Sequence, residues 1–311
     1  MSSAMEYKSH QNFDFSLDDN ILDERESFSP KVKVIYFSPT GTTKKIIKNV
    51  IKGIESKQVE YVDLTKDNRI SKKEKIDTTK DDLIILGAPV YGGFLYKEFR
   101  NYIKNIDFNN KAVAIVLLYG NAAIMFSKRE IVSIVKKNNG NVVGYGEFVG
   151  EHSFSTKELP VAINRPNAED INMAISFGKA IREELKNNIE KNKSLSLFDR
   201  FIGKVADIKP VHTGRRIFTI PKTYYELCDN CGVCIKKCPK ACIDNDIVTD
   251  KNACIVCMAC VKACHNNARI TKAKNPFVKY LTLIHPMDTS LEDISQHSHL
   301  DLPRWNLYNS A

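Results

Sequence analysis

Eight of the nine cysteines in this chain follow one spacing that occurs twice. Each repeat has three cysteines separated by two residues and a fourth three residues farther on. The first repeat comprises Cys228, Cys231, Cys234 and Cys238, and the second comprises Cys254, Cys257, Cys260 and Cys264. Three thiolates at this spacing hold three corners of an iron-sulfur cube, whereas the fourth points away and serves another cube. The pattern therefore predicts two 4Fe-4S clusters.

Structural zinc and disulfides also use closely spaced cysteines. Zinc takes four ligands, usually as two separated pairs of cysteines. Each repeat here has three cysteines at even spacing, which do not divide into such pairs. Disulfides suit small secreted domains, but nothing at the start of the sequence resembles a secretory signal. Thiolates held around iron need a reducing setting, so we expect a cytoplasmic and anaerobic location.

The cysteine-rich segment resembles bacterial-type two-cluster ferredoxins over roughly residues 223–272. The resemblance implies one cluster on Cys228, Cys231, Cys234 and Cys264, and a second on Cys254, Cys257, Cys260 and Cys238. Pro239 fits the family pattern, but His265 stands where a second proline is expected. His265 either loosens that turn or donates a hydrogen bond to a cluster sulfur. The ninth cysteine, Cys242, is expected to be a buried thiol and not a ligand.

A different pattern begins at Lys31, where short apolar runs alternate with amphipathic segments. Strands are expected over residues 32–37, 59–64, 82–88, 112–119 and 142–149, and helical periodicity covers 46–54, 95–103, 124–135 and 171–189. Parallel strands need crossover helices and bury both faces. The pattern predicts an α/β domain over 31–192 with a doubly wound parallel five-stranded sheet, beside a small α+β cluster domain. Ligands of such sheets bind at the carboxyl ends of the strands.

The turn after the first expected strand is rich in small and hydroxylic residues. It reads Ser38-Pro39-Thr40-Gly41-Thr42-Thr43 and leads directly into a helix. Hydroxyls and the amides of a helix N-terminus can hold a phosphate, although the same residues also start ordinary capped helices. The turn lacks the first glycine of a Walker loop, and no G-x-G-x-x-G follows any strand. We therefore do not expect nucleoside triphosphate chemistry.

Two more loops belong at the same edge of the sheet, and the three together resemble the flavodoxins. In that family the FMN phosphate lies in a [ST]-x-T-G-x-T loop, and the isoalloxazine ring is held by the next two strand-end loops. The resemblance implies FMN contacts from Ser38, Thr40, Gly41, Thr42, Thr43, Pro89, Val90, Tyr91, Gly92, Gly93, Tyr119, Gly120 and Asn121. Tyr91 would face the ring, unless it is an ordinary core tyrosine. Thr42 stands where flavodoxins commonly carry Asn.

From about residue 31 to 272 the chain resembles the flavodoxin/ferredoxin fusion proteins of anaerobic bacteria and archaea. The resemblance implies an electron-transfer protein that passes single electrons between two 4Fe-4S clusters and FMN, serves redox partner proteins and needs no catalytic residue. One alternative is a flavin-dependent reductase of a small acceptor, and another is a non-catalytic metal-binding module. For the reductase, Glu151 and His152 would form an acid/base pair; the simpler interpretation is that His152 packs in its loop.

The remaining segments are expected to be accessory. Residues 1–30 predict an acidic disordered tail, 193–222 a basic linker and 273–311 an irregular tail. The formal charge of +9 falls to about +5 if each cluster contributes about −2. Because the lysines are scattered along helical stretches, we do not expect nucleic-acid binding. The longest apolar run, Ala112 to Tyr119, is too short to span a membrane.

Overall fold

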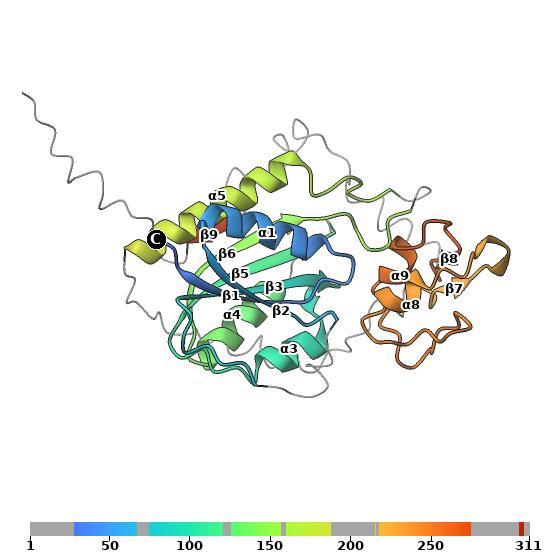
Figure 1. The fold of residues 1–311 in the computed structure, drawn as a ribbon, viewed down its shortest axis with the longest axis horizontal. Helices are drawn as coiled ribbons and strands as arrows, with labels where there is room; N and C mark the ends of the chain where they lie inside the picture. Colours follow the sequence, from blue (N-terminus) through green and yellow to red (C-terminus); the bar gives the residue numbers. More distant parts are fainter. Residues whose placement is uncertain are drawn as a thin grey trace, which may run out of the picture.

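The structure is a computed structural model that describes residues 28–66, 75–120, 126–156, 160–187, 215 and 218–274, and the backbone of 305–307. It consists of an α/β sheet domain and, beside it, a smaller unit formed by residues 218–274, which we call the cysteine unit (Figure 1). Among the described residues, no helix combines the length and the apolar character needed to cross a bilayer.

Five parallel strands form the body of the sheet in the order β2-β1-β3-β5-β6. Their bounds are β1 (Lys31–Tyr36), β2 (Gln58–Asp63), β3 (Leu83–Tyr91), β5 (Ala112–Tyr119) and β6 (Asn141–Val149). The order reverses direction between β1 and β3, which is the switch point where such sheets bind ligands. The predicted doubly wound α/β class is therefore confirmed.

Two short antiparallel strands extend the sheet beyond the prediction. The strand β4 (Phe94–Leu95) folds back on the end of β3, so that β3 continues to Tyr91 instead of ending near residue 88. The strand β9 (Trp305–Leu307) pairs with β6 at the sheet edge. The other described residues of the expected irregular tail are 273 and 274, and the expected acidic tail is described only for residues 28–30.

Helices cover both faces of the sheet (Figure 1). One face carries α1 (Thr42–Ile54) and α5 (Ala168–Lys186), and the other carries α3 (Lys97–Ile103) and α4 (Ser127–Lys137). Each layer buries its own apolar core against the sheet. The backbones of the two helices in the first layer lie very close together. A Cβ at Gly53 would be only 2.0 Å from the carbonyl oxygen of Ile175, so a larger residue does not fit there.

The cysteine unit is small and has little regular structure. It contains β7 (Lys222–Thr223), the 3-10 turn η2 (Tyr225–Leu227), α8 (Val233–Lys237), α9 (Ala259–Lys262) and β8 (Arg269–Ile270). Buried Arg269 bonds to two threonine hydroxyls and two carbonyl oxygens, those of Thr223, Thr249, Ile247 and Pro221. This α+β arrangement agrees with the predicted fold. Because the apolar core of such a small unit contributes little stability, these hydrogen bonds contribute a large share of it.

Candidate functional site

The loop between β1 and α1 has the geometry of an anion-binding turn. Gly41 precedes the helix with a φ of +86°, and a Cβ there would meet no atom within 4 Å. The buried Ser38 accepts a hydrogen bond on Oγ from the Lys44 amide at 3.1 Å, while its own amide donates to Thr65 Oγ1 at 2.6 Å. The loop is therefore held from both ends, with its tip facing solvent.

Donors remain available at the tip of this loop. Within the described part of the chain, the amides of Thr40, Thr42 and Thr43 donate to no residue. The first amides of a helix lack intrahelical acceptors and carry the positive end of its dipole. The hydroxyls of Thr40 and Thr42 lie 3.3 Å apart beside them. This donor set fits a phosphate dianion.

The second predicted loop is a tight hairpin. Gly92 and Gly93 both have left-handed φ values, 58° and 86°, and join the paired residues Tyr91 and Phe94. Two consecutive left-handed residues are what a two-residue hairpin turn requires. Pro89, Val90 and Tyr91 are therefore the half-buried end of β3 and not an open loop, a feature that the glycine pair signals in the sequence.

The third predicted loop starts with Tyr119, the last residue of β5, and Gly120, whereas Asn121 lies outside the described residues. The strands β1, β3 and β5 are parallel neighbours, so their carboxyl ends bring the three loops to one edge of the sheet. His152 also reaches this edge. A Cβ on Gly120 would lie 2.3 Å from His152 Cδ2, so only glycine leaves room for the imidazole.

Glu151 and His152 do not form a pair. His152 Nδ1 accepts a hydrogen bond from the amide of Phe154 at 3.2 Å, which leaves Nε2 to carry the proton of the neutral ring. Glu151 instead pairs with Lys262 of the cysteine unit. Burial, with a smaller contribution from Lys262, lowers the pKa of His152 from 6.5 to about 4. The packed interpretation of His152 fits this geometry, because a neutral buried ring is a poor proton exchanger at pH 7.

The lowered pKa of His152 predicts a pH-dependent stability. Unfolded His152 takes up a proton as the pH falls below 6.5, whereas the folded protein resists until about 4, so the stability contributed by the neutral ring is lost across this window. We expect a loss of about 3 kcal/mol between pH 7 and pH 4. Thermal unfolding at several pH values would measure it, with His152→Gln as the variant that should lose this part of the pH slope. Parallel pH profiles for both proteins would contradict the assignment.

Four cysteines from both repeats line one pocket of the cysteine unit. Cys238, from the first repeat, meets Cys254, Cys257 and Cys260, from the second. Apolar side chains such as Val256 and Met258 complete its wall. Four thiols that converge in an apolar pocket are a donor set that suits a 4Fe-4S cluster. We call these four cysteines the inner set.

Cys242 also lines this pocket but plays a different part. Its Sγ lies 3.3 Å from Cys238 Sγ. By donating S–H to Cys238 and Cys254, it lowers the pKa of Cys238 to about 6 and that of Cys254 to about 7, while its own pKa rises. Cys242 is 6% exposed, as expected for a buried thiol. The arrangement fits a protonated neighbour of two thiolates.

The other four cysteines, which we call the outer set, are more open to solvent. Cys231 is exposed, Cys228 and Cys264 are partly exposed, and only Cys234 is buried. The amide of Ala268 donates a hydrogen bond to Cys264 Sγ at 3.2 Å. The two sets therefore place the same kind of side chain in different surroundings.

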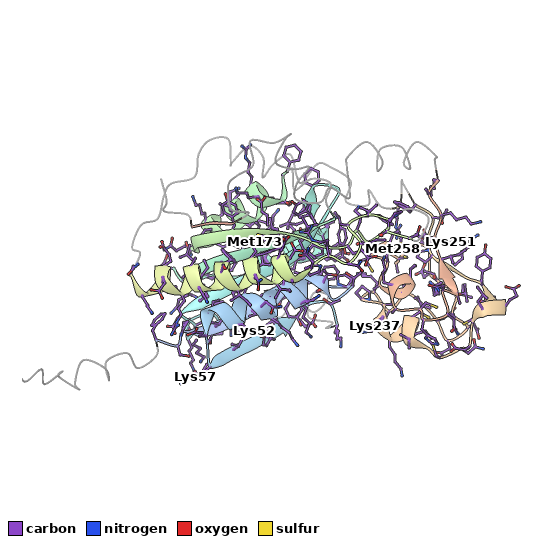
Figure 2. All side chains as sticks on the ribbon, turned by 90° about the horizontal axis from the view of Figure 1, so that it is seen from above. Lys52, Lys57, Met173, Lys237, Lys251 and Met258 are labelled. Carbon is purple, nitrogen blue, oxygen red and sulfur yellow. The ribbon has the colours of Figure 1, made fainter. Side chains whose placement is uncertain are left out.

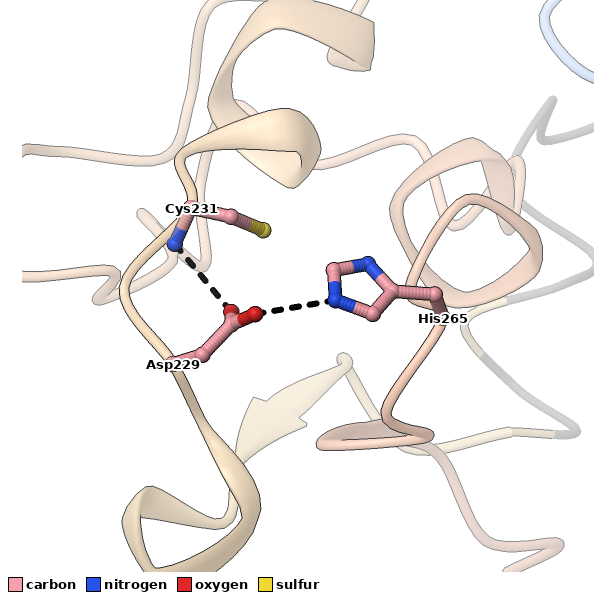
Figure 3. A group of neighbouring side chains, drawn as sticks. All are labelled: Asp229, Cys231 and His265. Carbon is pink, nitrogen blue, oxygen red and sulfur yellow. Dashed lines mark hydrogen bonds and ion pairs between the residues drawn. The ribbon is translucent and has the colours of Figure 1, made fainter.

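His265 contacts a carboxylate instead of a cysteine sulfur (Figure 3). Its Nε2 lies 2.9 Å from Asp229 Oδ2, and Asp229 Oδ1 accepts a hydrogen bond from the Cys231 amide at 3.2 Å. All three side chains are exposed. The contact joins the segment after the second repeat to the start of the first. Neither role predicted for His265 anticipated this contact, since Asp229 lies far from it in sequence.

The two repeats share a left-handed backbone conformation directly after their second cysteine. Gly232 and Met258 each follow the second cysteine of a repeat, and each takes a left-handed φ, 67° and 65°, to start α8 and α9. Glycine adopts this conformation freely, whereas methionine does so at a cost of about 1 kcal/mol. Met258 is only 1% exposed, so apolar packing offsets that cost. The internal repeat of the sequence is thus also a repeat of local structure.

The inner set faces the edge of the sheet domain. Phe154, after β6, stacks on Phe218 with ring centroids 3.7 Å apart, and both pack with Cys254. Lys262 pairs with Glu151 and donates to the Ser155 carbonyl oxygen at 2.7 Å. Lys240 lies 3.5 Å from Glu98 of α3 in a second ion pair. Basic residues of the cysteine unit therefore lie against acidic residues of the sheet domain. Such charge complementarity favours docking of the two units.

The Lys262 contact predicts a measurable loss of stability on charge reversal. In Lys262→Glu a repulsive pair replaces an attractive one, and the bond to the Ser155 carbonyl oxygen is lost. Since the pair is partly exposed, we expect a cost of about 1 kcal/mol, seen as a fall of roughly 2–4 °C in the thermal midpoint. Adding Glu151→Lys should recover part of it. Lys251→Glu, on the exposed surface of the same unit, serves as the control and should leave the midpoint unchanged.

The fold and the loop geometry define the sheet domain as flavodoxin-like. Residues 33–139 match the family model described as a flavodoxin domain. The chain is thus similar to flavodoxins in its N-terminal half, in agreement with the resemblance read from the three loops. The match does not extend to the cysteine unit.

Several solved structures are similar to this chain over about half of its length. A flavodoxin from the domain Archaea is 18% identical, covers 50% of this chain and 99% of its own, and has a TM-score of 0.38. A Streptococcus pneumoniae TIGR4 flavodoxin is 20% identical, with 51% and 99% covered and a TM-score of 0.35. A Fusobacterium nucleatum flavodoxin bound to flavin mononucleotide is 21% identical, with 51% and 96% covered and a TM-score of 0.32. No curated protein sequence matches the chain.

Proposed function

We propose that this protein is an electron carrier that binds FMN at the carboxyl edge of its flavodoxin-like sheet and two 4Fe-4S clusters in its cysteine unit. The observation that carries the proposal is the pocket in which Cys238 meets Cys254, Cys257 and Cys260. Cysteines from two repeats converge there as a ferredoxin-type crossing requires. The pocket lies in the unit that docks against the predicted flavin loops.

The residues of the sheet domain have distinct roles in this proposal. The amides and hydroxyls of residues 38–43 hold the FMN phosphate, with Lys44 and Lys45 adding positive charge. Tyr91 and Gly120 lie at the loops that would border the ring. When bound, FMN would exchange electrons either singly or in pairs, and each cluster would carry one electron at a time. The protein groups bind, orient and exclude water, and none reacts covalently.

The partners in this proposal are other redox proteins, and the setting is the anaerobic cytoplasm, where thiolates and clusters survive. A reductase of small acceptors is less well supported by the geometry. It would need a proton donor over the flavin, but Glu151 is engaged by Lys262 and the His152 ring is neutral. A metal-binding module without flavin would leave the donor-rich tip of the 38–43 loop without a ligand.

One anaerobic preparation tests the proposal. The full chain is purified without oxygen, and its ultraviolet-visible spectrum is recorded together with iron, sulfide and flavin assays. We expect about eight iron atoms, about eight sulfides and about one FMN per chain. Zinc without flavin would support the metal-binding module. Material with only one of the two kinds of cofactor would refute the proposal, and fast selective reoxidation by a small acceptor would favour the reductase.

A further inference from the structure

The two cysteine sets differ in burial. In the inner set, Cys254, Cys257 and Cys260 are each less than one-tenth exposed. In the outer set, Cys231 is exposed, and Cys228 and Cys264 are partly exposed. Two clusters held by these cysteines would therefore differ in their solvent accessibility. Since solvent exposure is one of the factors that set cluster potential and lability, the difference has functional consequences.

The inner set lies next to the predicted flavin loops. Ile255, between two inner cysteines, packs against the core of the sheet domain, as does Tyr91. Tyr91 also lies close enough to Cys257 for the two side chains to interact electrostatically. Phe154 packs with Cys238 and Cys254 from the other side. In Figure 2, Met258, the neighbour of Cys257, lies at the junction of the two units.

The outer set is bordered by exposed apolar side chains. Tyr224, Tyr225 and Leu227 are 43%, 57% and 53% exposed and lie directly before Cys228. They follow β7, which lies farther from the sheet than α9 does (Figure 1). The nearby Asp229 and His265 are exposed as well. This end of the cysteine unit is therefore the part of the cluster region that an external protein can reach.

We infer that the two sets act in a fixed order, with the inner set as the relay to the flavin loops and the outer set as the point where electrons cross the protein surface. The inference rests on the proposed function. Each electron leaves a reduced one-electron redox protein, which is thereby oxidised, enters at the outer set and passes through the inner set. Two such electrons and two protons from water reduce one FMN. Transfer rates fall steeply with distance, so the packing of Ile255 against the core of the sheet domain that Tyr91 also contacts favours this route.

Differential alkylation of the anaerobic holoprotein tests the order. The full chain is treated with bathophenanthroline disulfonate, which removes accessible iron, and with iodoacetamide, and modified cysteines are followed in time by peptide mass spectrometry. We expect the open outer cysteines Cys228, Cys231 and Cys264 to react at least several-fold faster than the buried inner cysteines Cys254, Cys257 and Cys260, together with release of the first half of the iron. Equal rates, or faster reaction of the inner set, would overturn the order. If the protein holds no clusters, exposed cysteines react before chelator is added, and the proposed function itself fails.

A pair of tyrosine variants tests the link to the flavin loops. Tyr91→Leu changes the surroundings of Cys257, whereas Tyr225→Leu changes the exposed end near Cys228. Electron paramagnetic resonance spectra and midpoint potentials of both clusters are recorded in the reduced holoproteins. We expect Tyr91→Leu to alter only the cluster whose iron is released slowly, and Tyr225→Leu to leave that cluster unchanged. The inference is wrong if Tyr91→Leu alters the rapidly released cluster or neither one.

Discussion

Replacing Cys257 with alanine is expected to halve the iron content of the protein. Cys257 lines the inner pocket and is 8% exposed, so solvent does not replace its thiolate, and the remaining thiol of the pocket, Cys242, already lies 3.3 Å from Cys238 Sγ. A cube that loses one of four ligands is lost or degraded under air-free purification, while the outer set keeps its four cysteines. We therefore expect about four iron atoms per chain instead of about eight. Iron and sulfide assays on anaerobic samples measure this directly.

Cys242→Ala is the matched control for this prediction. Cys242 lines the same pocket and is equally buried, but its Sγ lies 3.3 Å from Cys238 Sγ, and its raised pKa fits a protonated neighbour of Cys238 and Cys254. The control should retain about eight iron atoms, although loss of the donated bond should shift the potential of the inner cluster. The assignment of the inner set would be wrong if Cys242→Ala lost half the iron while Cys257→Ala kept all of it.

A negative charge at the tip of the 38–43 loop is expected to abolish tight FMN binding without unfolding the domain. Thr40 is exposed at the N-terminal end of α1, so Glu fits there without displacing the core. A carboxylate near a helix N-terminus is neutral or favourable to the fold by a few tenths of a kcal/mol. Its repulsion of a phosphate dianion at about 4 Å costs a few kcal/mol. We expect Thr40→Glu to raise the Kd for FMN about 100-fold.

Thr40→Gln separates charge from shape in this experiment. Glutamine has nearly the same volume as glutamate and no charge, so it should bind FMN far more tightly than Thr40→Glu does. Quenching of flavin fluorescence on addition of apoprotein gives both Kd values, and circular dichroism checks the fold. Equal affinities in the two variants would show that the phosphate does not lie at this loop.

The sheet was predictable because strands buried on both faces are apolar along their whole length. The run Ala112–Tyr119 is apolar throughout and became β5 with the same bounds. The helix α5 was also expected, but it starts at Ala168 because Asn167 and Asp170 form a capping box. The strand β9 was missed, since three residues far from their partner β6 carry no periodicity that indicates pairing.

The site was predictable in its parts and not in its arrangement. Spacing alone predicted the eight cysteines as cluster ligands, and one pocket is lined by the four that the resemblance assigns to a single cluster, which stays a prediction. The contact between Lys262 and Glu151 joins residues far apart in the chain, so no local pattern could indicate it. Gly92 and Gly93 form a hairpin turn at the carboxyl end of β3, and their predicted place at the ring edge stays a prediction. The neutral state of His152 follows from burial, which spacing does not report.

The pairing of β9 with β6 changes how the cysteine unit is connected to the rest of the molecule. Chain segments that leave the unit in both directions return to the sheet domain, one through α5 and the other through β9. A module attached at two points explores a smaller volume than one attached at a single point, so its local concentration at the docking edge is higher. Without residues 305–307, the chain would connect the cysteine unit to the sheet domain only through α5.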